Sequence, residues 1–267
     1  MSGLPSAPSG GVTRLTRIVL NSADPERLSR FFIDALGFLP AEGAYRLRLG
    51  ATTLELRPVG RRGRPYPADV PGWSPLFQHC ALITGDMTRS IARLTAWGGF
   101  AAISTAPQRL PAASGGVTAY KFRDPEGHPL EFIAPKPNGQ PVTVRIDHSA
   151  ISVSDTARSA AFYGSLGLKV GGQSLNVGIE QERLDRVPDA VVEVTALELP
   201  DGTAPHVELL RYRGDYNRAV PLSAPDDIAA TRLVFAVANE ATLARLASGA
   251  AALRDPDGHL LHFEVGG

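Results

Sequence analysis

The 267-residue sequence is poor in cysteine, in net charge and in long apolar runs. Its single cysteine, Cys80, cannot form a disulfide within the chain. Lys and Arg together number 27, as do Asp and Glu, and this balance argues against a general nucleic-acid or anionic-membrane partner. No apolar run reaches the roughly 18 residues of a membrane span. The opening MSGLPSAPSGG lacks the apolar core of a signal peptide, so we expect a soluble, cytoplasmic protein.

Several common catalytic motifs are also missing. The chain contains no HExxH, GxSxG, GxxxxGK or GxGxxG, so a hydrolase or a nucleotide-binding protein has no support in the sequence. What it does contain is one phrase written almost identically twice, FRDPEGHPLEF at 122–132 and LRDPDGHLLHF at 253–263. Proline fixes φ and glycine accepts positive φ, so each phrase predicts a turn between two strands.

A strand followed by a capped helix recurs four times, at 16–38, 78–99, 147–168 and 231–249. The expected helix N-caps are Asp24, Asp86, Asp155 and Asn239. Further strand-like sequence follows each helix and ends in the segments 52–57, 128–133, 205–212 and 259–265. The chain therefore predicts four β-α-β-β-β modules, of which the fourth is shortened. The corresponding fold class is α+β.

Proline and glycine mark the expected domain organisation. A flexible tail is predicted at 1–11, and the stretch APKPNGQPV at 134–142 suggests a linker at 136–142. We expect an N-terminal domain of two modules at 12–135 and a C-terminal domain of two modules at 143–267.

Two strand positions are polar in every module. Seven residues before each cap stand Arg17, His79, His148 and Arg232. At the centre of each last strand stand Glu55, Glu131, Glu208 and His262. Polar side chains in otherwise apolar strands are costly to bury unless they are paired or bind a metal. These eight residues are therefore the candidate site residues.

The repeated module, its His…Asp…Phe-Tyr…Leu-Gly beginning and its Asp-Pro-x-Gly-His-x-x-Glu end resemble the vicinal oxygen chelate superfamily. That superfamily includes glyoxalase I, methylmalonyl-CoA epimerase, extradiol dioxygenases and bleomycin- or fosfomycin-resistance proteins. The resemblance covers about residues 12–265. It implies that modules pair into two cups, in which first-strand and last-strand residues face a metal site. It is specific for the fold but not for the function, because this fold hosts many activities.

The resemblance leaves two ways to pair the modules. Pairing the first with the second and the third with the fourth gives two incomplete sites. Pairing the second with the third gathers two imidazoles and two carboxylates, a glyoxalase I-like set that we call the His/Glu cup: His79, Glu131, His148 and Glu208. The remaining modules then form a degenerate second cup, the Arg cup: Arg17, Glu55, Arg232 and His262. We favour this pairing, and we expect no metal in the Arg cup because a guanidinium repels a cation and offers no lone pair.

By resemblance, the His/Glu cup implies one divalent ion, which could be Zn, Ni, Mn, Co or Fe. The ion would chelate vicinal oxygens of a small-molecule substrate and act as a Lewis acid. Glu131 or Glu208 would be the catalytic base in a proton transfer next to a carbonyl, which makes the protein an isomerase or lyase. No substrate-binding residue is predicted, and a homodimer stays open.

Two other functions stay open. An extradiol dioxygenase using Fe(II) would take its three ligands from the C-terminal modules, where Arg232 and His262 depart from the pattern. A metal-free binding or resistance protein would need no intact catalytic group. The arginine-rich loop at 57–67 has no predicted role beyond a solvated or anion-contacting surface.

Overall fold

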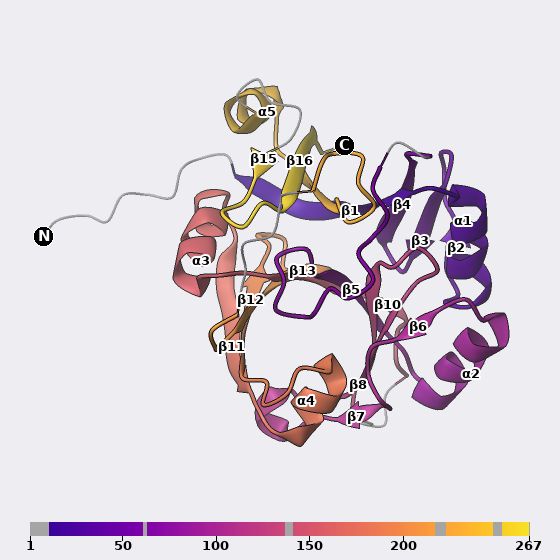
Figure 1. The fold of residues 1–267 in the computed structure, drawn as a ribbon. Coiled ribbons are helices and arrows are strands. Elements are labelled where there is room, and N and C mark those ends of the chain that lie inside the picture. The colour runs from indigo at the N-terminus through magenta and orange to yellow at the C-terminus, as the bar shows by residue number, and fades with distance from the viewer. Residues whose placement is uncertain (1–10, 61–62, 137–140, 217–222, 248–252, 267) are drawn as a thin grey trace, which may run out of the picture.

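A computed structural model describes residues 11–60, 63–136, 141–216, 223–247 and 253–266. The predicted tail lies outside these ranges except for Gly11, as do residues 137–140 of the predicted linker. The architecture is α+β, as predicted, with two β-sheets and few helices (Figure 1). Within the described ranges, every helix is too short or too polar to cross a membrane.

The chain forms its elements in the predicted modular order. The first module comprises β1 (Val12–Ser22), α1 (Pro25–Asp34), β2 (Leu39–Pro40), β3 (Arg46–Leu49) and β4 (Thr52–Pro58). The second comprises β5 (Gln78–Ile83), α2 (Met87–Trp97), β6 (Ala101–Ala102), β7 (Gln108–Arg109), the 3-10 helix η1 (Ala112–Ser114), β8 (Thr118–Arg123) and β9 (Pro129–Ala134). The third comprises β10 (Arg145–Ser152), α3 (Thr156–Ser165), β11 (Lys169–Asn176), α4 (Ile179–Asp185), β12 (Val192–Glu198) and β13 (His206–Tyr212). The fourth comprises β14 (Arg232–Val237), α5 (Glu240–Ala247), β15 (Leu253–Arg254) and β16 (Leu260–Val265).

Each sheet combines one module from the N-terminal half with one from the C-terminal half. The nine-stranded sheet has the order β11-β12-β13-β10-β5-β9-β8-β6, with β7 paired to β8, and so joins the second and third modules. The seven-stranded sheet has the order β15-β16-β14-β1-β4-β3-β2 and joins the first and fourth. At the centre of each sheet two first strands meet antiparallel, β5 with β10 and β1 with β14. This is the second of the two pairings that the sequence allowed.

The first and last strands of every module pair in parallel and in the same register. The residue directly opposite the last-strand candidate is Val19 for Glu55, Ala81 for Glu131, Ala150 for Glu208 and Val234 for His262. In each module that opposite residue follows the first-strand candidate by two positions. Because residues two apart lie on the same face of a strand, the eight candidate positions occupy equivalent places on one face of their sheets.

The predicted helix caps hold the helices in place. The side chains of Asp24, Asp86 and Asp155 accept hydrogen bonds from backbone N–H groups three residues later, and Asn239 does the same at α5. Figure 1 shows α1, α2 and α3 outside the ring of strands. The helix α1 buries Leu28, Phe31 and Phe32 against the sheets, and Phe31 meets Trp97 of α2 edge to face at 5.0 Å. The largest apolar cluster therefore packs between the helices and the sheets, while polar and apolar side chains share the inner faces of the cups.

The two repeated phrases form the predicted turns and also join the sheets. In the first, Asp124 Oδ1 accepts hydrogen bonds from the backbone N–H groups of Glu126 and His128. In the second, Asp255 Oδ1 accepts the two equivalent bonds. Glu126 then reaches the other sheet, where it accepts bonds from the N–H groups of Ala23 and Asp24 at 2.9 and 2.8 Å. Asp257 makes the matching contact with the Ser154 N–H at 3.1 Å.

Candidate metal centre

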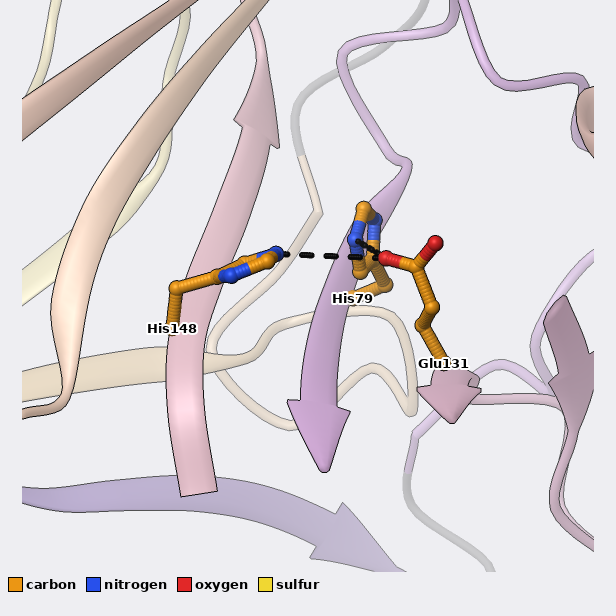
Figure 2. Close-up of side chains that lie close together, drawn as sticks. All are labelled: His79, Glu131 and His148. Carbon is orange, nitrogen blue, oxygen red and sulfur yellow. Dashed lines mark hydrogen bonds and ion pairs between the residues drawn. The ribbon is translucent and has the colours of Figure 1, made fainter. Parts of the chain in front are cut away.

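The two histidines of the His/Glu cup lie on neighbouring strands and point at one carboxylate. His79 comes from β5, His148 from β10 and Glu131 from β9, and their side chains converge (Figure 2). His79 Nε2 lies 2.9 Å from Glu131 Oε2, and His148 Nε2 lies 3.9 Å from the same oxygen. All three side chains are buried. The predicted convergence of the second and third modules is thus present for these three residues.

Glu208 borders this group without closing it. Its Oε2 lies 3.5 Å from His148 Nε2, and its Oε1 lies 3.2 Å from His206 Nε2. The ligand atoms of His79, Glu131 and His148 lie within 4.8 Å of one another, a group that does not include Glu208. Glu208 is also the more exposed of the two glutamates, with 20% of its side chain accessible against 8% for Glu131.

The donor set has the spacing and chemistry of a divalent-metal site. Ligand bonds of about 2.1 Å place neighbouring donor atoms about 3.0–3.4 Å apart in octahedral or tetrahedral geometry. The separations of 2.9, 3.5 and 3.9 Å that link His79, Glu131, His148 and Glu208 bracket this range. Two imidazoles and two carboxylates suit Zn²⁺, Ni²⁺, Mn²⁺, Co²⁺ or Fe²⁺. His79, Glu131 and His148 therefore lie close enough together to hold a divalent ion, whereas Glu208 lies outside that group.

Burial and neighbouring charges set the protonation of Glu131 and His79. Burial acts to raise the pKa of Glu131, but Lys121 and the two histidines outweigh it and bring that pKa to about 2. Burial and the nearby Lys121 lower the pKa of His79. Glu131 is thus a carboxylate and His79 a neutral imidazole at neutral pH, the forms that bind a metal.

His148 is surrounded by carboxylates and differs from His79 in its second ring nitrogen. Burial acts to lower the pKa of His148, yet Glu208, Asp147 and Glu131 together raise it to about 9. His148 Nδ1 lies 3.3 Å from Asp147 Oδ2, which orients the ring. His79 Nδ1, by contrast, is buried and has no hydrogen-bond partner among the residues that the structure describes. Asp147 therefore holds the second ring nitrogen of His148, whereas the second ring nitrogen of His79 has no such carboxylate among the described residues.

A buried ammonium lies beside the three converging side chains. Lys121, on β8, is directly opposite Glu131 in the β8–β9 ladder, and its Nζ lies 2.7 Å from Asp185 Oδ1. Asp185 Oδ2 accepts hydrogen bonds from Tyr212 Oη at 2.7 Å and Gln181 Nε2 at 2.6 Å. Burial acts to lower the pKa of Lys121, but Asp185 and Glu131 outweigh it and raise it. The helix α4 thus supplies the carboxylate that keeps this cation inside the cup.

The His/Glu cup encloses a cavity of about 440 Å³. The candidate ligands lie on its wall with Lys121 and Asp147. Apolar side chains make up much of the remaining wall, including Ile133, Leu184, Val192, Val194 and Leu210. The volume and the mixed lining are those of a site for a small organic molecule.

The Arg cup has the same frame but a different set of contacts. Arg17 Nε lies 3.2 Å from Glu55 Oε2, and Arg46 Nε lies 2.9 Å from the same oxygen. Arg17 also pairs with Glu264 at 2.8 Å. Glu55, which matches Glu208 by position, is therefore paired with two guanidinium groups.

The other two residues of the Arg cup, Arg232 and His262, carry no negative charge. Arg232 donates to Asn21 Oδ1 at 2.8 Å and to the carbonyl oxygens of Ala230 and Pro225. Burial, followed by the positive charges of Arg232, Arg57 and Arg17, lowers the pKa of His262. The four predicted residues line one cavity of about 350 Å³. Of the arginine-rich loop, Arg57 lies on this cavity, Arg64 pairs with Asp227 at 2.6 Å, and residues 61–62 fall outside the described ranges.

Sequence analysis missed three charged or ionisable residues of the His/Glu cup. Asp147 adjoins His148, and strand alternation would place it on the opposite face. A register shift between Ile146 and His148 turns both 147 and 148 toward the cavity. Lys121 carried a usable signal, because it is the only charge inside the strand segment TAYKF. His206 had one as well, since it lies two residues before Glu208 on the same face.

Comparison with known proteins supports the fold at two levels. Residues 145–263 match the family model of the Glyoxalase/Bleomycin resistance protein/Dioxygenase superfamily. The crystal structure of glyoxalase I from Zea mays covers 94% of this chain and 92% of its own, with 16% sequence identity and a TM-score of 0.63. A mutant of the same enzyme superposes with a TM-score of 0.64, at 17% identity and with 94% and 92% of the two chains covered.

Among curated protein sequences, none matches. The predicted resemblance is therefore confirmed: residues 145–263 carry the sequence pattern of the Glyoxalase/Bleomycin resistance protein/Dioxygenase superfamily, and the chain folds as glyoxalase I does.

Proposed function

We propose that this protein is a divalent-metal-dependent isomerase or lyase of the glyoxalase I-like type, which moves a proton next to a carbonyl of a small substrate with vicinal oxygens. The observation that carries the proposal is the convergence of His79, Glu131 and His148 within 4.8 Å on the wall of a 440 Å³ cavity, with Glu208 3.5 Å from His148. These four residues would hold the metal. When bound, the ion would supply Lewis-acid stabilisation of negative charge on substrate oxygen.

The two glutamates are suited to different tasks. Glu131 is held by His79 at 2.9 Å and is buried, so it is fixed in place. Glu208 lies outside the three-donor group, is more exposed and lines the cavity. A base must reach the substrate and move between proton acceptance and return. We therefore assign the base to Glu208 and a positioning role to Glu131.

Lys121 and the apolar wall would shape substrate binding. The ammonium of Lys121 lies on the cavity wall and is oriented by Asp185 at 2.7 Å. It can donate to an oxygen of a substrate that carries partial negative charge. The apolar side chains of β12 and β13, such as Val192 and Leu210, would contact the carbon part of that substrate and exclude water.

Metal content tests this proposal. Wild type and His148→Ala would be reconstituted separately with Zn²⁺, Ni²⁺, Mn²⁺ and Fe²⁺, and the bound metal counted by mass spectrometry. His262→Ala is the control, because it removes a histidine from the Arg cup, where His262 occupies the last-strand position equivalent to that of Glu131. We expect one ion per chain in wild type and in His262→Ala, and a substantial loss in His148→Ala.

Two outcomes would contradict the proposal. If wild type takes up none of the four metals, the protein is a metal-free binder. If His148→Ala binds metal as well as wild type does, the ion lies elsewhere. If one of the metals binds as expected, activity against small substrates with vicinal oxygens would be measured on that metal form, with Glu208→Gln expected to lose turnover while it keeps most of its metal.

A further inference from the structure

We propose that the Arg cup is a second binding site, which takes a small organic carboxylate with an apolar body. It lies on the opposite sheet from the His/Glu cup and does not depend on the metal proposed there. The side chains of Arg17, Arg57 and Arg232 line its cavity of about 350 Å³. The carboxylates beside these guanidinium groups are Glu55 and Glu264, which pair with Arg17, and Asp226, which pairs with Arg57.

The guanidinium of Arg232 has no such partner among the residues that the structure describes. This residue is 5% exposed, and its hydrogen bonds go to the neutral oxygens of Asn21, Ala230 and Pro225. Among the residues that the structure describes, no carboxylate lies within ion-pair distance of its guanidinium. A buried charge without an opposite partner is costly, and a bound anion would remove that cost.

The other two arginines are held so that they border the same space. Arg17 is fixed by Glu55 at 3.2 Å and Glu264 at 2.8 Å. Arg57 is held by Asp226 at 2.9 Å, and 39% of its side chain is exposed. Preorganised guanidinium groups lose little conformational entropy when a carboxylate arrives, which favours a bidentate contact.

The rest of the wall indicates an organic anion. Val19, Val234, Leu260 and Phe263 line the cavity beside the arginines. An inorganic phosphate would leave these apolar surfaces unused, whereas an aromatic or aliphatic carboxylate would cover them. The imidazole of His262, whose pKa is lowered, is neutral at neutral pH and adds a hydrogen-bonding group without further charge.

The test uses benzoate as the probe and benzamide as its uncharged counterpart, titrated by calorimetry into the chelator-treated full chain. We expect saturable benzoate binding and no measurable benzamide binding. Because a charge-assisted hydrogen bond is lost, Arg232→Gln should weaken benzoate binding about tenfold or more. Arg57→Gln removes a half-exposed charge and should weaken it about two- to fivefold.

Three controls separate this site from its alternatives. Arg30→Gln removes an exposed arginine of α1 and should leave benzoate binding unchanged. His148→Ala should also leave it unchanged, which places the probe outside the His/Glu cup. Circular dichroism would check that Arg232→Gln is folded, and Arg57→Gln carries the test if it is not. The proposal is overturned if wild type does not bind benzoate, if phosphate or benzamide binds as tightly, or if Arg57→Gln and a folded Arg232→Gln both bind like wild type.

Discussion

The His/Glu cup and the Arg cup share one backbone frame and differ in what their side chains can do. In both, two first strands meet antiparallel at the centre of the sheet, and each last strand pairs with the first strand of its own module in the same register. His79 and His148 in one cup stand where Arg232 and Arg17 stand in the other. An imidazole can offer a lone pair to a metal, and a guanidinium cannot.

The local backbone irregularities match as well. A register shift between Ile146 and His148 turns Asp147 toward the His/Glu cavity. The equivalent shift in β1 lies between Leu15 and Arg17, where Thr16 donates to Glu264 Oε1 at 2.8 Å. The same bulge thus places a carboxylate beside His148 in one cup and a hydroxyl that holds a glutamate in the other. The side chains at these equivalent positions therefore decide the chemistry of each cup, because the same backbone accommodates both sets.

The largest effect should come from giving one cup the residues of the other. The double variant His79→Arg, His148→Arg places two guanidinium groups where two neutral donors are needed. We expect metal affinity to fall by more than about 100-fold, since even residues that only orient a ligand are worth 10- to 100-fold. Competition with a fluorescent chelator would measure it. An unchanged metal affinity would mean that the arginines are not what distinguishes the Arg cup from the His/Glu cup in metal binding.

Removing a carboxylate partner should cost far more stability in the His/Glu cup than in the Arg cup. Asp185→Asn leaves the ammonium of Lys121 buried and unpaired, because these side chains are 1% and 5% exposed. We expect a loss of about 3–5 kcal/mol in the free energy of unfolding. Glu55→Gln acts on side chains that are 25% and 22% exposed, and should cost about 1 kcal/mol or less. Urea denaturation of both variants checks the difference, and equal losses would contradict it.

Asp147→Asn tests the orienting carboxylate that the Arg cup lacks. The variant weakens the contact between Asp147 Oδ2 and His148 Nδ1, which spans 3.3 Å, and keeps the side-chain volume. Metal affinity should fall about 10- to 100-fold without loss of fold. Thr16→Val, at the matching bulge of the Arg cup, is the control and should leave metal affinity unchanged. An unaltered affinity in Asp147→Asn would show that His148 needs no orienting partner.

The two cups should also differ in the direction of their pH dependence in chelator-treated protein. The pKa of His148 is raised from 6.5 to about 9, so its contribution to stability is complete below pH 6.5 and is lost as the pH rises through 9. The pKa of His262 is lowered, so the unfolded chain binds its proton more readily, and stability falls as the pH drops below about 6.5.

Urea denaturation between pH 5 and pH 10 would measure both slopes. His148→Gln should flatten the alkaline side of the stability profile, and His262→Gln should flatten the acid side. A single variant that flattens both sides, or variants that flatten the wrong side, would show that the charges in the two cups are arranged differently.

The sequence sufficed for the frame because the frame depends on local signals. Caps such as Asp24 and Asp155, and turns such as Asp124 to His128, act within a few residues of the chain. Their fourfold recurrence located the positions that face the cups. The pairing of modules could be argued only from the metal-binding side chains that each pairing brings together.

The contacts of Lys121 and the orientation of Asp147 in the His/Glu cup could not be predicted from the sequence, because they depend on distant residues and on one local irregularity. Lys121 is stabilised by Asp185, which lies 64 residues later on α4 and is in turn held by Tyr212. The sequence around Lys121 therefore does not indicate that Asp185 is its partner. Asp147 breaks the alternation on which strand analysis rests, since the register shift adds one residue beside His148.

We propose that the metal occupies the His/Glu cup and is excluded from the Arg cup by its arginines. The most direct measurement is anomalous diffraction from crystals of the protein loaded with the metal that it binds best. The account predicts one anomalous peak per chain, within bonding distance of His79, Glu131 and His148. A peak beside Arg17 or Arg232, or no peak in either cup of a metal-loaded crystal, would contradict it.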